Sequence, residues 1–243
     1  MLERSDTPDT QTYLARVFDT CGQVLQHQGL LLEARLEFER ALCLREAAAD
    51  PVGEAWTLGS LGRLCMELEL GDFAATAGYL ARDLAIVEEL SPERTRVRAQ
   101  LLSHLGTCAV EQGDAEQGRG YFTRSVALAR ADNDAFGLAF AAIGLGRVAL
   151  LGADLAQAEK HAEEALAHLA SSAFSQDDQE GVRGLIHQLK AEVHLARNAT
   201  PQAVEAFAAA YTCFLQTSRD SVVEMARLLY GYARACLANG EEQ

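Results

Sequence analysis

The sequence is poor in proline. Only 4 prolines occur among 243 residues, and because proline breaks a helix from within, long uninterrupted helices are allowed. Valine and isoleucine are few and scattered, whereas alanine and leucine are abundant, a balance that favours helices over an extensive sheet. No stretch approaches the roughly 18 uninterrupted apolar residues of a membrane-spanning helix. We therefore expect an all-α protein with no membrane-spanning segment.

Blocks of basic residues are also lacking. The chain has 21 Lys and Arg against 35 Asp and Glu, which gives a formal net charge of -14. The nearest approach to a basic run is Arg94, Arg96 and Arg98, beside Glu93. A nucleic-acid backbone is repelled by an acidic surface without a segregated basic stripe. We expect a protein, peptide or small-molecule partner and no nucleic acid.

Paired cysteines are missing as well. The cysteines are dispersed and none lies in a C-x-x-C pair, so a disulfide framework is not expected. Each falls where a small apolar residue would fit a helix, which predicts reduced, buried thiols. The first ten residues are polar and lack the apolar core of a signal peptide, so we expect a cytoplasmic protein. The cysteines are Cys21, Cys43, Cys65, Cys108, Cys213 and Cys236.

Motifs of catalysis and of metal or cofactor binding do not occur. There is no G-x-S-x-G, no Walker loop and no H-E-x-x-H. The pairs His161/His168 and His187/His194 are each spaced roughly 10 Å along a helix, too far for two ligands of one zinc ion without a third group. Residues 144–149 match the letters G-x-G-x-x-A, but a dinucleotide site needs a preceding strand and the surrounding sequence is helical. We expect no catalytic residue, no cofactor site and no metal site.

An internal repeat is present. Gly22, Gly62, Gly106 and Gly146 follow one another at steps of 40, 44 and 40 residues, and the last three each follow a leucine. Spacings of three and four residues place side chains on one face of a helix. Such residues recur four before each glycine and three after it: Phe18, Leu58, Leu102 and Ala142 before, and Leu25, Cys65, Ala109 and Ala149 after.

A turn and a second helix follow each of these helices. Glycine suits the left-handed position that ends a helix, and aspartate caps the start of the next one. The turns read His27-Gln28-Gly29, Leu70-Gly71-Asp72, Gln112-Gly113-Asp114 and Gly152-Ala153-Asp154. The second helix of each pair has a small residue before and after a central residue, and the small residues let two helices approach closely. These helices carry Ala34, Phe38 and Ala41, then Gly118, Phe122 and Ser125, then Ala158, Ala162 and Ala165.

The frame resembles the tetratricopeptide repeat, W-x-x-L-G-x-x-Y followed by Ala and then Phe. The best match is Phe18 to Leu25 with Ala34, Phe38 and Ala41. The resemblance covers about residues 14–240 and implies a right-handed superhelical solenoid of antiparallel helix pairs, about five pairs plus a terminal helix. The period of about 40 residues exceeds the usual 34 and looks like that of bacterial signal-responsive regulators and kinesin light chains.

Two copies depart from the pattern. The second has Thr76, Leu80 and Asp83 where Ala, Phe and Ala are expected, and the fifth, from about Leu185, lacks the Leu-Gly pair. With these copies included, we expect a polar N-terminal segment at 1–13, repeats at about 14–50, 54–91, 97–132, 137–171 and 182–217, and a terminal helix at 221–238.

The resemblance also indicates which side chains line the concave groove of the array. By the tetratricopeptide frame these are the residue just after each glycine and the residues three and six before it. The rule selects Trp56, Gly59 and Arg63, then Gln100, Ser103 and Thr107, then Phe140, Ile143 and Arg147, and in the terminal helix Arg227, Tyr230 and Arg234.

Arginines and aromatic residues recur among these positions, and both are common anchors of an interface. If neighbouring first helices lie about 10 Å apart, Arg63 and Arg147 are separated by roughly 20 Å, which an extended peptide covers in about six residues. We therefore expect an extended or helical peptide, acidic in character, in the groove. The alternative is that the arginines pair with neighbouring Glu or Asp and that Trp56 packs between repeats.

The terminal helix is apolar on more than one side, with Val222, Leu228, Leu229 and Tyr232. Repeat arrays usually need a polar cap at the end. Either its charged minority supplies that cap, or an exposed patch self-associates, which predicts a homodimer through this helix.

The function that these observations predict is a non-catalytic scaffold or regulatory adaptor that binds a protein or peptide. One alternative is a sensor module that binds a signalling peptide or small ligand and gates an effector domain outside this chain. An enzyme, such as a helical phosphatase, is a third reading that no motif supports.

Overall fold

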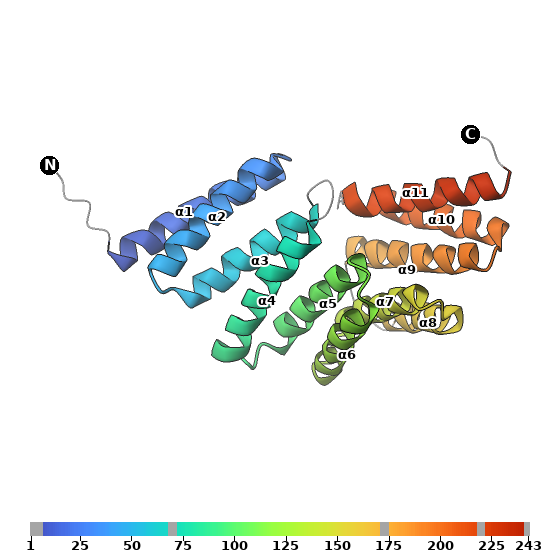
Figure 1. The fold of residues 1–243 in the computed structure, drawn as a ribbon, viewed down its shortest axis with the longest axis horizontal. Helices are drawn as coiled ribbons and strands as arrows, with labels where there is room; N and C mark the ends of the chain where they lie inside the picture. The colour runs from blue at the N-terminus through green and yellow to red at the C-terminus, as the bar shows by residue number, and fades with distance from the viewer. Residues whose placement is uncertain (1–6, 68–71, 171–174, 218–221, 241–243) are drawn as a thin grey trace. The chain divides into compact units, whose positions relative to one another are not determined.

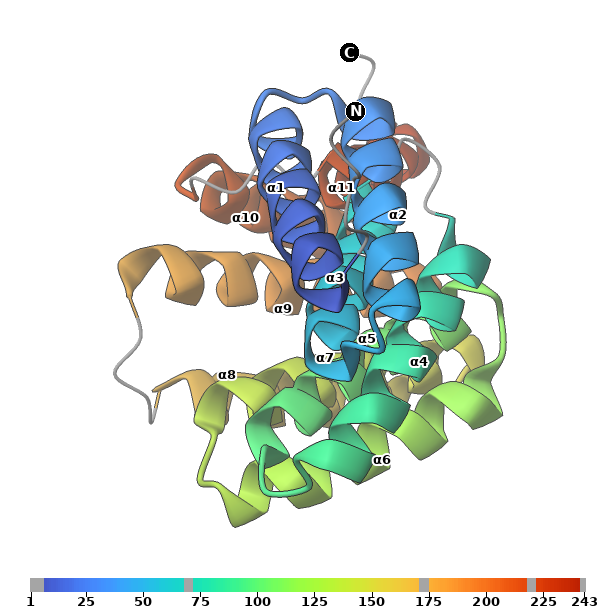
Figure 2. The same ribbon diagram turned by 90° about the vertical axis from the view of Figure 1, so that its left-hand side faces the viewer.

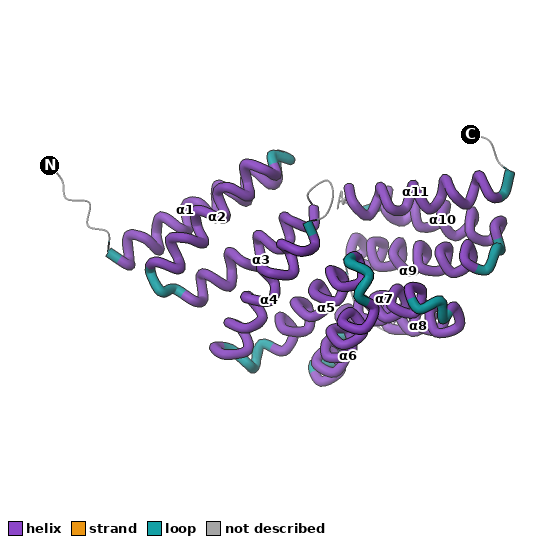
Figure 3. The backbone as a smooth tube through the Cα atoms, viewed as in Figure 1, coloured by secondary structure: helices purple, strands orange, loops and turns teal. Residues whose placement is uncertain are grey.

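The computed structural model describes residues 7–67, 72–170, 175–217 and 222–240, and this part of the chain contains helices and no strand (Figure 3). The all-α repeat fold is therefore confirmed. The helices are α1 (Pro8–His27), α2 (Leu31–Ala47), α3 (Pro51–Glu67), α4 (Phe73–Leu90), α5 (Thr95–Glu111), α6 (Ala115–Ala131), α7 (Ala135–Leu151), α8 (Leu155–Ala170), α9 (Gln176–Ala196), α10 (Thr200–Leu215) and α11 (Val222–Ala238).

Consecutive helices pair as antiparallel hairpins, α1 with α2 and so on to α9 with α10, and α11 packs on α10 (Figure 1). The chain divides into two compact units, Met1–Arg94 with α1 to α4 and Thr95–Gln243 with α5 to α11. The sequence was interpreted as one array over 14–240, whereas its contacts gather into these two bodies.

Aspartate caps begin several helices, as the turns predicted. Asp72, Asp114 and Asp154 each accept a hydrogen bond from the backbone N–H three residues later, at 3.0, 2.9 and 3.1 Å. Two helices begin earlier than expected for the same reason. Thr7 caps α1, which starts at Pro8 inside the segment assigned as polar, and Ser175 caps α9, which starts before residue 182.

The left-handed turn positions match the sequence only in part. Gly29 and Gly113 have φ of 76° and 80°, as expected. At the fourth turn the positive φ of 57° falls on Ala153, because Gly152 still closes α7 with helical hydrogen bonds. Gly71 of the second turn lies outside the described residues.

Close contact between a glycine and a large side chain holds the helix pairs together. A Cβ on Gly22 would lie 2.8 Å from the Phe38 ring, and one on Gly106 would lie 2.8 Å from the Phe122 ring. Phe122 also fills the space at Gly144, where a Cβ would lie 2.2 Å from it. The ring of Phe122 is 1% exposed and is enclosed by α5 and α7. The repeated glycines are therefore sites of helix contact, where any side chain would collide.

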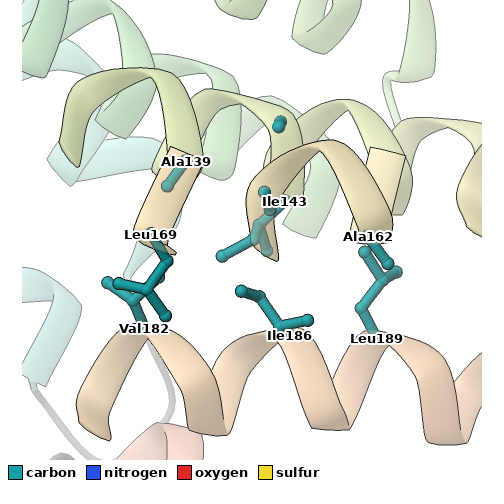
Figure 4. Close-up of a cluster of buried hydrophobic side chains, with 9 residues drawn as sticks. Ala139, Ile143, Ala162, Leu169, Val182, Ile186 and Leu189 are labelled. Atoms are coloured by element: carbon teal, nitrogen blue, oxygen red, sulfur yellow. The ribbon is translucent and has the colours of Figure 1, made fainter. Parts of the chain in front are cut away.

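The fourth repeat solves the same packing problem differently. Its second helix has Ala162 where Phe is expected, and Leu189 of α9 fills the space at Gly146, where a Cβ would lie 2.5 Å from it. Figure 4 shows Leu189 together with Val182 and Ile186 pointing from α9 toward Ile143 and the side chains of α8. The missing ring is thus replaced by the following repeat.

A buried polar cluster joins the first three helices, of which α1 and α2 lie side by side in Figure 2. The Arg45 guanidinium donates to Asp19 and Asp50, at 2.6 Å each, and to the Thr57 hydroxyl at 3.1 Å. Thr57 donates in turn to Asp19 at 2.9 Å. A side chain on Gly53 would collide with the Arg45 guanidinium, 1.7 Å away. Glycine is thus required at position 53 for this cluster to form.

The prediction of six buried thiols was partly wrong. All six cysteines are free and four are buried, but Cys21 and Cys43 are exposed. Both lie on the first hairpin, on the side of α1 and α2 opposite to their buried residues. In the first repeat, a helix position that holds a small apolar residue can therefore be exposed to solvent.

Gly144→Ala is expected to destabilise the protein by about 1–3 kcal/mol, because the Phe122 ring has no space into which it can move. Urea unfolding followed by circular dichroism measures the change. Gly120→Ala, in the exposed part of α6 where a Cβ would have nothing within 4 Å, is the matched control. It should instead stabilise by about 0.5–1 kcal/mol, because alanine loses less chain entropy. Equal effects of the two substitutions would contradict the packing argument.

Arg45→Ala is expected to destabilise the protein by about 3–5 kcal/mol, because the buried carboxylate of Asp19 loses its cation. Arg16→Ala, at an exposed position of α1, should change the free energy of unfolding by less than about 0.5 kcal/mol. Thermal unfolding of both variants checks this, and a loss at Arg45 as small as at Arg16 would show that the cluster contributes nothing net.

Candidate peptide-binding groove

The inner helices of the second unit enclose an open cavity. Helices α5, α7, α9 and α11 contact one another in that order. Their side chains, ending at Arg234 of α11, line a cavity of about 420 Å³. The lining mixes leucines with charged groups, since it contains Val110, Glu111, Arg147, Leu150, Leu151, Glu192, Leu195, Ala196 and Arg234. The cavity thus offers apolar contact and ionic recognition together.

Two of the predicted groove arginines are held by one carboxylate. Glu111, the last residue of α5, accepts from Arg147 of α7 through Oε1 and from Arg227 of α11 through Oε2, the latter at 2.5 Å. All three side chains are largely buried, at 14%, 23% and 28% exposure. At these two positions the alternative interpretation holds, because both arginines pair with a neighbouring Glu.

The fifth repeat contributes two groove residues that the frame had not selected. Ala203 and Phe207 of α10 are fully buried, as the matching residues of other repeats are. Counting back from them places Ala191 at the glycine position, so that Glu192 and Gln188 take the places of Arg147 and Ile143. The loss of the Leu-Gly pair concealed them, although this spacing could have found them.

Glu192 lies in an environment that disfavours its charge. Burial raises the pKa of its carboxyl, while Arg147, a hydrogen bond from Gln188 and Arg227 oppose that rise. The Gln188 amide donates to it at 3.2 Å, and the Gln188 carbonyl oxygen, itself buried, has no hydrogen-bond partner in the structure. A buried amide with one unsatisfied oxygen therefore lies directly beside the cavity carboxylate Glu192.

Arg234 of α11 lines this cavity, and the exposed Tyr230 lies next to it on the same helix. The Arg234 guanidinium lies 5.7 Å from the centre of the Tyr230 ring, and Tyr230 is 68% exposed. A guanidinium over an aromatic face is a stable arrangement that leaves its hydrogen-bond donors available. Both side chains are exposed, and their place in a binding groove stays a prediction.

The third and fourth repeats place their remaining predicted residues differently. Ser103 is buried and shares a 2.8 Å hydrogen bond with Ser125, while half-buried Thr107 donates to the Ser103 carbonyl at 3.1 Å. Phe140 is half-buried against the core and stacks on Phe136 at 6.0 Å. Of this group Gln100 is exposed. Ser103 and Phe140 are thus occupied by helix packing, and their assignment to the groove surface is corrected.

In the first unit the predicted positions on α3 are open. Trp56 is 59% exposed, so it does not pack between repeats, and Arg63 is exposed and donates to the Ser60 hydroxyl at 3.2 Å. Between them, Gly59 leaves a gap. The Asp83 carboxylate of α4 reaches into that gap, 3.0 Å from the place that a Cβ at position 59 would take. The Asp83 carboxylate and the Arg63 guanidinium, which lies 3.6 Å from the same point, therefore both lie beside Gly59.

Metal clusters and membrane-spanning helices are both absent among the described residues. No group of three or more His, Cys, Asp or Glu side chains there is arranged to hold a metal ion, and none of the helices there has both the length and the apolar character to cross a membrane. Leu229 and Leu237 of α11 are 47% and 75% exposed, and the homodimer through this helix stays a prediction.

A family model described as tetratricopeptide repeat matches residues 97–171. This part of the chain is therefore identified as tetratricopeptide repeats. The match covers α5 to α8, the helices of the third and fourth repeats. No curated protein matches the sequence.

Solved structures of three other proteins have the same fold. BtubC (BKLC) from P. vanneervenii is 17% identical with a TM-score of 0.62, over 86% of this chain and 82% of that one. Kinesin-light-chain-type repeats from Podosopora anserina are 15% identical with a TM-score of 0.60, over 86% and 99%. MamA is 17% identical with a TM-score of 0.51, over 79% and 91%. Identities this low show the fold alone.

Asp83→Asn is expected to stabilise the protein at pH 8 by on the order of 2 kcal/mol and to have little effect near pH 4. Burial raises the pKa of Asp83 from 3.8 to about 6, against the opposing charges of Arg63 and Arg94. The unfolded chain therefore ionises first, and stability falls as the pH rises through this range. Urea unfolding at both pH values tests it, and a gain that does not depend on pH would refute the cause given.

Proposed function

We propose that the protein is a non-catalytic interaction scaffold that binds a segment of a partner protein on the inner helices of its repeats. The observation that carries this proposal is the cavity of about 420 Å³ lined by the inner helices of the second unit. A repeat fold that presents such a surface typically binds proteins or peptides.

The chemistry of the exposed groups suggests what kind of segment binds. The first unit exposes Trp56 and Arg63, seven residues apart on α3, and the second exposes Tyr230 next to Arg234. Tryptophan, tyrosine and arginine dominate the binding energy of most interfaces. An acidic segment with apolar side chains would use both features, since arginine pairs with carboxylates and leucines line the cavity.

A regulatory role as a sensor is the alternative. A cavity of this volume also falls within the range of small-ligand pockets, about 300–1,000 Å³, so a signalling peptide or small ligand could occupy it. Such a ligand would fit the cavity of the second unit and would leave Trp56 and Arg63 unused.

The test is a selection of peptides from a random displayed library with the wild-type protein, followed by fluorescence anisotropy on the recovered sequences. We expect acidic, apolar peptides whose affinity falls about tenfold or more with Arg63→Glu or Arg234→Glu. Arg119→Glu, the same charge change at an exposed position of α6, is the matched control and should leave affinity within about twofold.

Each outcome has a clear meaning. Loss with Arg234→Glu alone places the peptide on the second unit, and loss with Arg63→Glu alone places it on the first. If Arg63→Glu and Arg234→Glu both leave the affinity unchanged, as the control does, the inner helices are not the binding surface. Failure to recover any peptide, together with ligand-dependent stabilisation by small molecules, would favour the sensor.

A further inference from the structure

Glu111 lies where the acidic group of a ligand would be expected. Its two carboxylate oxygens each accept from a different arginine, one on α7 and one on α11. Two guanidinium groups that converge on one carboxylate are a common way to bind an anion, because charge-assisted hydrogen bonds fix both oxygens. The three residues come from three inner helices, so the anion position exists only in the folded unit.

Comparison of the two units shows that the repeat itself does not require this acid. Arg63 and Arg147 both directly follow the glycine of their inner helix. In the repeat before Arg147, the residue five positions after the glycine is Glu111. In the repeat before Arg63, the residue at the same place is His27. Arg63 is exposed, whereas Arg147 is mostly covered and paired. The repeat therefore does not require an acid here, since His27 replaces it in the first repeat; Glu67 holds the same place in the second repeat, where the residue after the next glycine is Thr107 and not an arginine.

The position of Glu111 allows it to leave. It is the final residue of α5, directly before the turn at Gln112 and Gly113, and helix ends are where side chains and backbone move most readily. It also lines the cavity, next to the leucine side chains of α7 and α9. A ligand in the cavity can thus reach the carboxylate without opening the helix pairs.

We propose that Arg147 and Arg227 form an anion site for a carboxylate group of the bound segment, and that Glu111 occupies this site when no partner is present. This rests on the proposed function for its ligand, but the anion site itself is a property of the folded chain. Exchange of one carboxylate for another leaves the arginines paired throughout. An acidic segment therefore gains affinity only if it also fills the apolar part of the cavity, beside Leu150 and Leu195. A free anion competes poorly with Glu111, so the intramolecular contact rejects simple acids.

Glu192 is the one other carboxylate of the cavity lining. It is held by the Gln188 amide at 3.2 Å. If Glu111 were removed, Glu192 could move toward the arginines and take its place, so a test must include a variant without either carboxylate.

The experiment compares wild type, Glu111→Gln and Glu111→Gln/Glu192→Gln, with inorganic phosphate as the anion probe at constant ionic strength. Isothermal titration calorimetry measures binding, and circular dichroism confirms that each variant is folded. We expect phosphate to bind one or both variants at least about tenfold more tightly than wild type. Adding Arg147→Gln and Arg227→Gln to the binding variant should abolish that gain. Glu116→Gln, the same charge change at an exposed position of α6, should behave as wild type.

Two results would overturn the inference. One is phosphate binding no tighter in either variant than in wild type. The other is a gain that persists after both arginines are replaced, or that Glu116→Gln reproduces, since it would then reflect net charge alone. Neither result depends on a partner peptide. If the anion site fails this test, the peptide selection still tests the proposed function independently.

Discussion

The contact between a glycine on an inner helix and a large side chain on a neighbouring helix is the constraint on which this structure depends. A glycine without a Cβ lets two helix backbones approach, and the space between them is filled by a single ring or leucine. Gly22 with Phe38, Gly62 with Leu80 and Gly106 with Phe122 repeat this contact in the first three hairpins. This contact also influences which side chains of the inner helix stay uncovered, among them Arg63 beside Gly62.

The fold could be predicted from the sequence because this constraint leaves a visible mark. Leu-Gly pairs at regular steps, small residues in the second helices and Asp at the turns are all local signals, and each helix hairpin appears where they place it. Helix starts were less accurate at Pro8 and Gln176, since the caps at Thr7 and Ser175 lie in polar sequence that has no periodic pattern. The division into two units was not predicted, because it depends on contacts between repeats that differ little in sequence.

The exposure of several candidate residues was predictable, and the pairings of the others were not. Trp56, Arg63, Tyr230 and Arg234 are exposed, as a place on a groove surface requires. It could not show that Ser103 would bond to Ser125. Pairings of this kind depend on side chains 20 or more residues away in sequence, and on whether burial leaves them another partner. The Glu111 pairs are of the same kind, and the fifth repeat was missed because the frame was anchored on a glycine that Ala191 replaces.

The position of Phe122 has a consequence for how such a chain can change in evolution. One ring occupies space left by a glycine of its own hairpin and by Gly144 of the following one, and Phe207 similarly meets Gly231 of α11. Deleting or duplicating a single repeat would therefore leave a void on one side and a collision on the other. These repeats share a frame, but they are not interchangeable modules, and the array can gain or lose length readily only where no such shared side chain crosses the boundary.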